Sequence, residues 1–189
     1  MNLRPISIAR GSTLFNGSAR DLHGQLCRFH QTNGNGSVIE VEGIFQDPGE
    51  QERNQGKITF HFPGDQSISY IDTSHGIVQI VPLGNAQILD GKMLDGKLKL
   101  GEELKIGSDE KPATREEIGA ALSRTTKGHA YGVKVYINGS IKIFSGQLCA
   151  GEPNEIAFNL NSGSKYRLPL NEITRLNIRR IAKVRVEQS

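Results

Sequence analysis

Apolar and polar residues alternate with a period of two through most of the C-terminal region. The apolar positions of residues 133–137 fall on one face of a strand, and Asn138-Gly139 follows them directly. Because Asn and Gly tolerate positive φ angles, this pair predicts a tight hairpin turn into a second strand. Alternation continues at Ile156, Phe158 and Leu160, at Tyr166, Leu168 and Leu170, at Ile173, Leu176 and Ile178, and at Ile181, Val184 and Val186. The pattern predicts a meander of about five short strands.

One segment departs from this alternation and has the signals of a helix. Thr114-Arg-Glu-Glu117 fits a capping box, in which Thr114 is the N-cap and the Glu117 side chain reaches back. Ile118 and Leu122 lie one helical turn apart and form a narrow apolar stripe. We therefore expect a helix over residues 115–126 that leads into the C-terminal strands.

The N-terminal half carries similar alternation in shorter pieces. Residues 47–55 are polar and predict a long exposed loop, and the pairs Asp90-Gly91 and Asp95-Gly96 predict hairpin turns within residues 84–111. The alternating positions are Ile39 and Val41, then Ile58, Phe60 and Phe62, then Ile68 and Tyr70. Among the alternating positions of both halves, we expect Ile58, Phe60, Ile156 and Phe158 to be core residues.

The two halves also share a repeated pattern. Asn35-Gly36-Ser37 and Gly43 recur 103 positions later as Asn138-Gly139-Ser140 and Gly146. After the longer loop of residues 47–55 the separation becomes 98, and it pairs Ile58 with Ile156, Phe60 with Phe158, Ile68 with Tyr166, Tyr70 with Leu168, Val78 with Leu176, and Ile80 with Ile178. A competing match at 122 positions pairs Asn16-Gly-Ser18 and Gly24-Gln-Leu-Cys27 with residues 138–140 and 146–149. We prefer the first match because it spans more positions, and it predicts a duplication.

The C-terminal repeat resembles the Sm-like family of small β-barrels, whose pattern SH3-like barrels largely share. The resemblance is carried by Val133-x-Val135-x-Ile137-x-Gly139, then Gly146-x-Leu148, then Asn154-x-Ile156-x-Phe158. It implies a short helix followed by five bent strands, with Gly146 allowing the second strand to bend, and it implies ring-shaped assemblies. The family's Arg-Gly signature before the last strand is absent, because Leu170-Asn-Glu-Ile173 stands there, so its RNA pocket is not carried over.

These patterns together predict a mainly β protein with two related small β-barrel units, connecting hairpins and one short helix. We expect an N-terminal domain of residues 1–111, with a barrel-like unit at about 25–82 and a hairpin insertion at 84–111. A C-terminal domain of residues 112–189 would hold the helix, the Sm-like barrel and a basic last strand.

Charge is concentrated in that last strand. The net charge is +3, but residues 113–189 alone carry 12 basic and 6 acidic residues. Such an excess fits a polyanionic or acidic partner, but it fits equally a solvated strand face followed by a frayed tail. The candidate phosphate contacts are Arg175, Arg179, Arg180, Lys183 and Arg185, and the interleaved apolar residues Ile181, Val184 and Val186 are candidate interface positions.

The sequence carries no recognisable catalytic or metal-binding motif. The sequence has no phosphate-binding loop, dinucleotide fingerprint or nucleophile elbow. Cys27 and His30 are spaced as a possible metal pair, but a site needs three or four ligands. We expect no enzyme activity, cofactor or metal. No apolar run is long enough to span a membrane and no secretion signal is evident, so a cytoplasmic location is expected.

Three binding functions therefore stay open. The first is a non-catalytic binding or assembly module that acts through a protein partner or self-association as a homo-oligomer. The second is an Sm-like nucleic-acid (RNA) binding protein that uses the basic C-terminal strand. The third is a protein that binds a small molecule, such as a nucleotide, at a subunit boundary.

Overall fold

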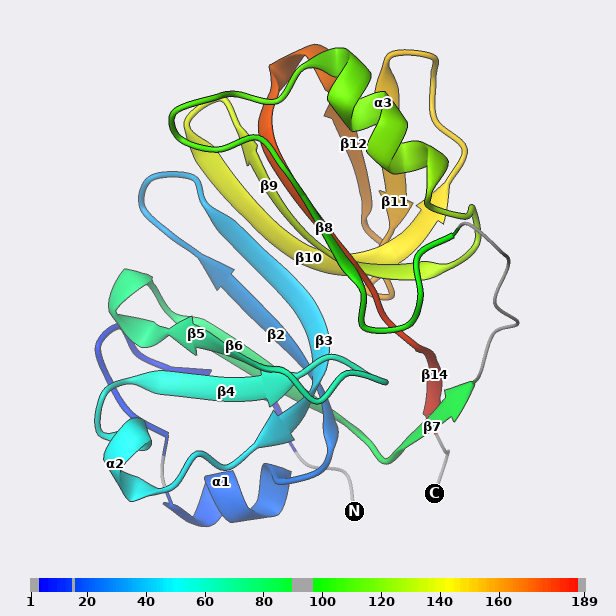
Figure 1. The fold of residues 1–189 in the computed structure, drawn as a ribbon. Helices are drawn as coiled ribbons and strands as arrows, with labels where there is room; N and C mark the ends of the chain where they lie inside the picture. Colours follow the sequence, from blue (N-terminus) through cyan, green and yellow to red (C-terminus); the bar gives the residue numbers. More distant parts are fainter. Residues whose placement is uncertain (1–3, 15, 90–96, 187–189) are drawn as a thin grey trace. The chain divides into compact units, whose positions relative to one another are not determined.

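The chain folds mainly as β-strands, in agreement with its alternating sequence. A computed structural model describes residues 4–14, 16–89 and 97–186. Contacts divide the chain into two units, Met1–Leu89 with Val184–Ser189, and Asp90–Lys183. Both units are drawn in Figure 1. The sequence placed the boundary at 111/112, whereas these contacts place it at 89/90.

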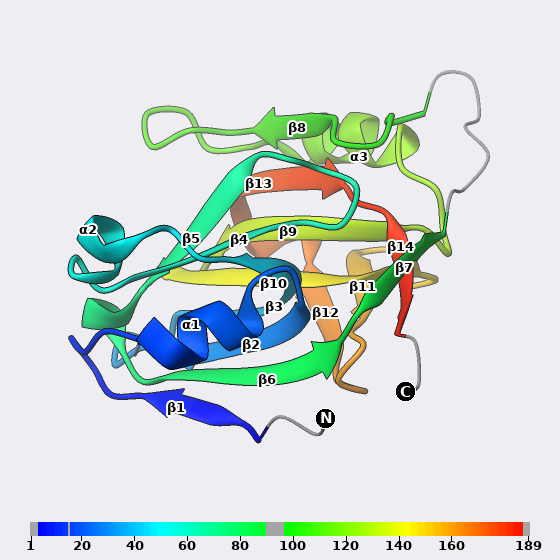
Figure 2. The same cartoon turned by 90° about the horizontal axis from the view of Figure 1, so that it is seen from below.

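The first unit contains a six-stranded antiparallel sheet with the strand order β1-β6-β2-β3-β4-β5. Figure 2 shows β1 running beside β6. The elements are β1 (Ile6–Ile8), α1 (Asn16–Leu22), β2 (Leu26–Thr32), β3 (Val38–Gln46), α2 (Glu50–Arg53), β4 (Lys57–His61), β5 (Ile68–Asp72), the 3-10 turn η1 (Thr73–His75), β6 (Val78–Gly84) and β7 (Ala86–Leu89), which pairs with β14 (Lys183–Val186). The loop expected at residues 47–55 therefore contains one short helix, α2.

The second unit has the strand order β8-β13-β9-β10-β11-β12, again antiparallel. Its elements are β8 (Glu103–Ile106), α3 (Arg115–Ser123), β9 (Ala130–Ile137), β10 (Ser140–Cys149), β11 (Glu155–Asn159), β12 (Lys165–Pro169), the 3-10 turn η2 (Leu170–Glu172) and β13 (Ile173–Arg180). Because β8 pairs with β13, this part of the expected insertion at 84–111 belongs to the second unit. The turns expected at Asp90-Gly91 and Asp95-Gly96 lie outside the described residues.

Neither sheet closes into a barrel. Among the described residues of the first unit, the end strands β1 and β5 each pair with one strand, β6 and β4 respectively. The end strands of the second unit, β8 and β12, pair in the same way with β13 and β11. Each unit is therefore an open sheet with two edges, where the sequence led us to expect small barrels.

Local sequence signals explain the helix and the central hairpin. Thr114 Oγ1 accepts a hydrogen bond from the Glu117 N–H at 3.2 Å, and the Glu117 carboxylate accepts one from the Thr114 N–H at 3.0 Å. The predicted capping box is thus confirmed, although α3 ends at Ser123 rather than 126. Asn138 and Gly139 have φ angles of 49° and 73°, and Ile137 pairs with Ser140, which confirms the predicted tight turn.

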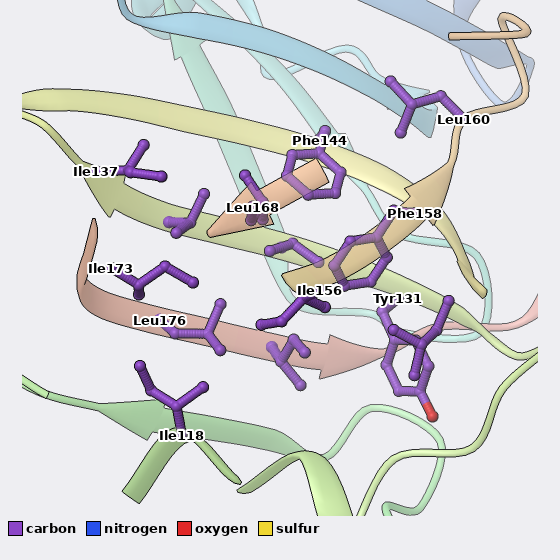
Figure 3. Packing of buried hydrophobic residues seen from close by; sticks show 14 of the residues in the cluster. Ile118, Tyr131, Ile137, Phe144, Ile156, Phe158, Leu160, Leu168, Ile173 and Leu176 are labelled. Carbon is purple, nitrogen blue, oxygen red and sulfur yellow. The ribbon is translucent and has the colours of Figure 1, made fainter. Parts of the chain in front are cut away.

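The predicted core residues are buried. Ile58, Phe60, Ile156 and Phe158 are all less than 5% exposed. In the second unit Phe158 packs edge to face on Phe144, and Figure 3 shows both rings among the apolar side chains of β9, β11 and β13. Burial of these side chains removes apolar surface from water and is the main force that holds each sheet in place.

Two strand glycines lie where a neighbouring strand approaches closely. A Cβ atom at Gly146 would lie 2.9 Å from the Asn159 carbonyl oxygen, and one at Gly43 would lie 3.1 Å from that of His61. Gly43 pairs with Cys27 between β2 and β3, and Gly146 pairs with Tyr131 between β9 and β10. Both glycines therefore serve close backbone contact rather than an unusual φ angle.

The secondary structure distinguishes between the two possible repeat alignments, at 103/98 and at 122 positions. The match at 122 positions aligns Asn16-Gly-Ser18, which begins α1, with the hairpin turn at residues 138–140. The preferred match aligns strand with strand, but it needs one change. Along β5 and β12, buried and exposed side chains follow in the same order. This order aligns Ile71, which is 1% exposed, with Leu168, which is fully buried. The separation there is 97 positions rather than 98.

Candidate functional site

Two basic residues of the last long strand are held by acidic partners. Arg175 lies on β13, 2.9 Å from the Asp109 carboxylate, and its guanidinium carbon lies 3.5 Å from the centre of the Tyr136 ring. Arg179 lies 3.2 Å from the Glu103 carboxylate on the paired strand β8. Both side chains therefore have an acidic partner within the second unit, which competes with phosphate groups for them.

A third basic residue, Arg180, points inward and is only 8% exposed. It alternates with Leu176 and Ile178 along β13, so it lies on the same buried face. Its Nη1 donates to the carbonyl oxygens of Ala130, at 3.1 Å, and Ile181. Burial lowers the pKa of Arg180 below its usual range. The structure therefore does not bring the five predicted basic residues together on one surface.

The remaining candidates lie in or beside β14. Lys183 and Arg185 are exposed at alternate positions of this strand. Ile181 is 4% exposed, while Val184 and Val186 are half-buried. The interface expected at these three residues assumed that nothing in the chain covered them. For Ile181 that assumption is wrong, because the side chain is buried within the chain itself.

The largest exposed apolar side chains identify a surface that sequence reasoning missed. Ile68 and Tyr70 on β5 are 69% and 61% exposed, and both lie on the side of the strand opposite Ile71. Lys57 Nζ lies 5.4 Å from the centre of the Tyr70 ring and partly flanks it. β5 is an end strand, so its outer backbone edge has no partner among the described residues.

The corresponding end strand of the second unit, β12, exposes charged side chains instead of apolar ones. At the positions that match Ile68 and Tyr70, β12 carries Lys165 and Arg167, both exposed. Charged side chains on an edge strand oppose pairing with another sheet, whereas uncharged ones permit it. The sequence signal for this contrast was the absence of charge at residues 68–71, which we had counted only as apolar alternation.

Metal and thiol chemistry find no support in the described residues. Within residues 4–14, 16–89 and 97–186, no group of three His, Cys, Asp or Glu residues could hold a metal ion. Cys27 is fully buried, and burial raises its pKa to about 12, which leaves it protonated and unreactive at neutral pH. Cys27 and His30 are neighbours along β2 but face opposite sides of the sheet, since their separation is odd.

Comparison with known proteins gives no relative from which function could be carried over. No family model, no curated protein and no solved structure matches the chain. Across the described residues, no helix is both long and apolar enough to cross a membrane.

Proposed function

We propose that the protein is a non-catalytic assembly module whose copies associate through the outer edge of β5. The observation that carries the proposal is the exposure of Ile68 and Tyr70, at 69% and 61%, on a strand with an open edge. An exposed edge with apolar side chains favours addition of another strand, because backbone hydrogen bonds and apolar burial act together.

The other three end strands are less suited to such pairing. β1 has three residues, Ile6–Ile8, β8 exposes Lys105, and β12 exposes Lys165 and Arg167. If each copy pairs through this one edge, association stops when two copies have joined. We therefore propose a homodimer in which two β5 strands pair antiparallel across a two-fold axis, so that the same patch meets itself.

We further propose that the two units are related folds produced by duplication, and that they belong with the Sm-like proteins. Each unit has a short helix, four strands, a 3-10 turn and a fifth strand in the same order. Gly43 and Gly146 lie at matching registers, and β5 and β12 share one burial sequence. A short helix followed by five strands with a glycine in the second is also the order that the Sm-like resemblance implies.

Nucleic-acid binding stays the second candidate, supported by the exposed Lys183 and Arg185 on β14. Since Arg175 and Arg179 have acidic partners, such a complex would use few phosphate contacts. Its affinity would therefore fall only gently as salt increases. A homodimer formed by apolar burial should persist or tighten under the same increase.

Light scattering on size-separated protein tests the dimer. The wild-type chain should have twice the monomer mass of 20.7 kDa, and the double variant Ile68→Lys with Tyr70→Lys should have the monomer mass. The matched control is Ile88→Lys with Leu100→Lys, which changes two exposed apolar residues outside β5. Monomeric wild-type protein at high concentration, or equal dissociation of the control, would overturn the proposal.

A further inference from the structure

A positive charge is buried in the second unit without an acidic partner. Arg180 is 8% exposed, and no carboxylate in the described part of the chain lies within ion-pair distance of it. Its hydrogen bonds to the carbonyls of Ala130 and Ile181 both come from Nη1, and its guanidinium carbon lies 5.8 Å from the centre of the Tyr131 ring. A buried charge without a counter-charge is unfavourable, and neighbouring Arg175 and Arg179 both avoid it.

Two further basic groups belong to the same part of the second unit. His129 directly precedes Ala130, whose carbonyl oxygen accepts the hydrogen bonds of Arg180 Nη1, at 3.1 Å, and of the Ile181 N–H, at 3.2 Å. Lys183 lies three positions after Arg180, at the start of β14. Burial lowers the pKa of His129, and the positive charges of Arg180 and Lys183 lower it further. Among the described residues, no carboxylate offsets these positive charges at the imidazole. The basic groups of His129, Arg180 and Lys183, from three segments of the second unit, therefore lie together without a described acidic partner.

A hydroxyl group lies beside them. The Thr126 carbonyl accepts a hydrogen bond from the His129 N–H at 3.2 Å, and the Tyr131 hydroxyl accepts one from the Thr126 N–H at 2.8 Å. The Thr126 Oγ1 atom is buried and has no hydrogen-bond partner in the described structure. Buried hydroxyl groups are normally hydrogen-bonded, so this oxygen is left able to donate to an acceptor that the described residues do not supply.

We propose that His129, Arg180 and Lys183 form a binding site for a small oxyanion of the phosphate class. This proposal is independent of the β5 dimer. The remaining N–H groups of the Arg180 guanidinium match the spacing of oxyanion oxygens, and the Lys183 ammonium adds a mobile positive charge. The bound anion supplies the counter-charge that the described residues do not provide for Arg180, and protonated His129 adds a third contact.

Sulfate is the probe of choice because it stays doubly charged over the pH range in which histidine titrates. Sulfate also raises the melting temperature of proteins non-specifically, so variants are required. The melting temperature of the wild type should rise and saturate with sulfate. The double variant His129→Gln with Lys183→Gln should show only the unsaturated, non-specific rise. Arg180 is left unchanged because its bonds to Ala130 and Ile181 hold the end of β13.

The matched control is Lys165→Gln, which removes an exposed lysine elsewhere in the second unit. It should respond to sulfate as the wild type does, and inorganic phosphate should compete with sulfate for the site. Equal sulfate responses of the wild type and the double variant would overturn the proposal. Binding of a single-stranded oligonucleotide without any saturable sulfate response would overturn it too, and would favour a nucleic-acid surface instead.

The His129 imidazole gives an independent reading by NMR. A bound dianion favours the imidazolium form, so sulfate should raise the pKa of His129, by about one unit for a charge in contact. By linkage, sulfate should then bind about tenfold more tightly to the protonated protein than to the neutral one. An unchanged His129 titration at saturating sulfate would contradict a site at this histidine.

Discussion

Phe144 and Phe158 meet edge to face in the core of the second unit, with their ring centres 5.1 Å apart and their planes at 69°. Phe144 lies on β10 and Phe158 on β11, and both are fully buried. The contact therefore joins two adjacent strands through their side chains as well as through their backbones. Aromatic pairs in this geometry add stability beyond the area that they bury.

Replacing Phe158 by Ala should lower the free energy of unfolding by about 3–5 kcal/mol, because it removes a buried ring and leaves a cavity. Urea unfolding followed by circular dichroism measures the change. Leu100→Ala is the control, since Leu100 is 41% exposed and should cost much less. Similar losses in the two variants would show that Phe158 is not a core residue.

Replacing Gly146 by Ala should destabilise the second unit by about 1–3 kcal/mol, as overpacking does. The added Cβ would lie 2.8 Å from Leu160 Cδ2 and 2.9 Å from the Asn159 carbonyl oxygen, so β10 and β11 would have to separate. Gly119→Ala is the matched control in α3, where a Cβ meets nothing within 4 Å. It should stabilise the helix by about 0.5–1 kcal/mol. A neutral Gly146→Ala variant would refute the close-approach interpretation.

The capping carboxylate should make stability depend on pH. Hydrogen bonding from the Thr114 N–H, and then from Lys111, lowers the pKa of Glu117. The folded state therefore binds fewer protons than the unfolded state in the acid range. The stabilisation is present above the unfolded-state pKa of about 4.3 and is lost as pH falls through the lower folded-state pKa.

Glu117→Gln separates the charge from the hydrogen bond. Glutamine can still accept the Thr114 N–H bond but does not titrate, so the variant should lose less stability on acidification than the wild type. Urea unfolding at a series of pH values measures both curves. If the two curves run parallel between neutral pH and the acid range, Glu117 does not carry this dependence.

The two cysteines should differ sharply in reactivity. Cys27 is fully buried with a pKa of about 12, whereas Cys149 is partly exposed. An aromatic disulfide reagent at mildly alkaline pH should label one thiol per folded chain and two per unfolded chain, because the thiolate is the reacting form. In Cys149→Ser the folded chain should not react. Rapid labelling of that variant would mean that the first unit opens readily around β2.

Sequence alone predicted the elements whose signals are local. The alternation of residues 133–137 and the Asn138-Gly139 pair together determine the β9–β10 hairpin, and Thr114 with Glu117 determine where α3 begins. The period-two alternation of apolar residues also predicted the burial of Ile156 and Phe158. Each of these features depends on residues that are close together in the chain.

The alternation of side chains did not predict the buried face where apolar residues occupy both faces of a strand. In β5, Ile68 and Tyr70 lie on one face of the strand and Ile71 lies on the other, so apolar residues occur on both faces. Only pairing with β4 determines that Ile71 faces inward. The same rule, applied to Leu176 and Ile178, would have placed Arg180 on the buried face of β13. We had counted its charge as a sign of exposure. The partners Asp109 and Glu103 could not be predicted, because they lie about 70 residues from Arg175 and Arg179.

The pairing of β1 with β6 has a consequence for the chain as it is being made. Ile8 pairs with Val78, so some 70 residues must follow β1 before its partner exists. At about 5–20 residues per second, that interval lasts several seconds on the ribosome. The β2–β3 hairpin needs no such delay, since Thr32 pairs with Val38. The first unit should therefore grow outward from that hairpin, with the N-terminal strand, although synthesised first, taking its place last.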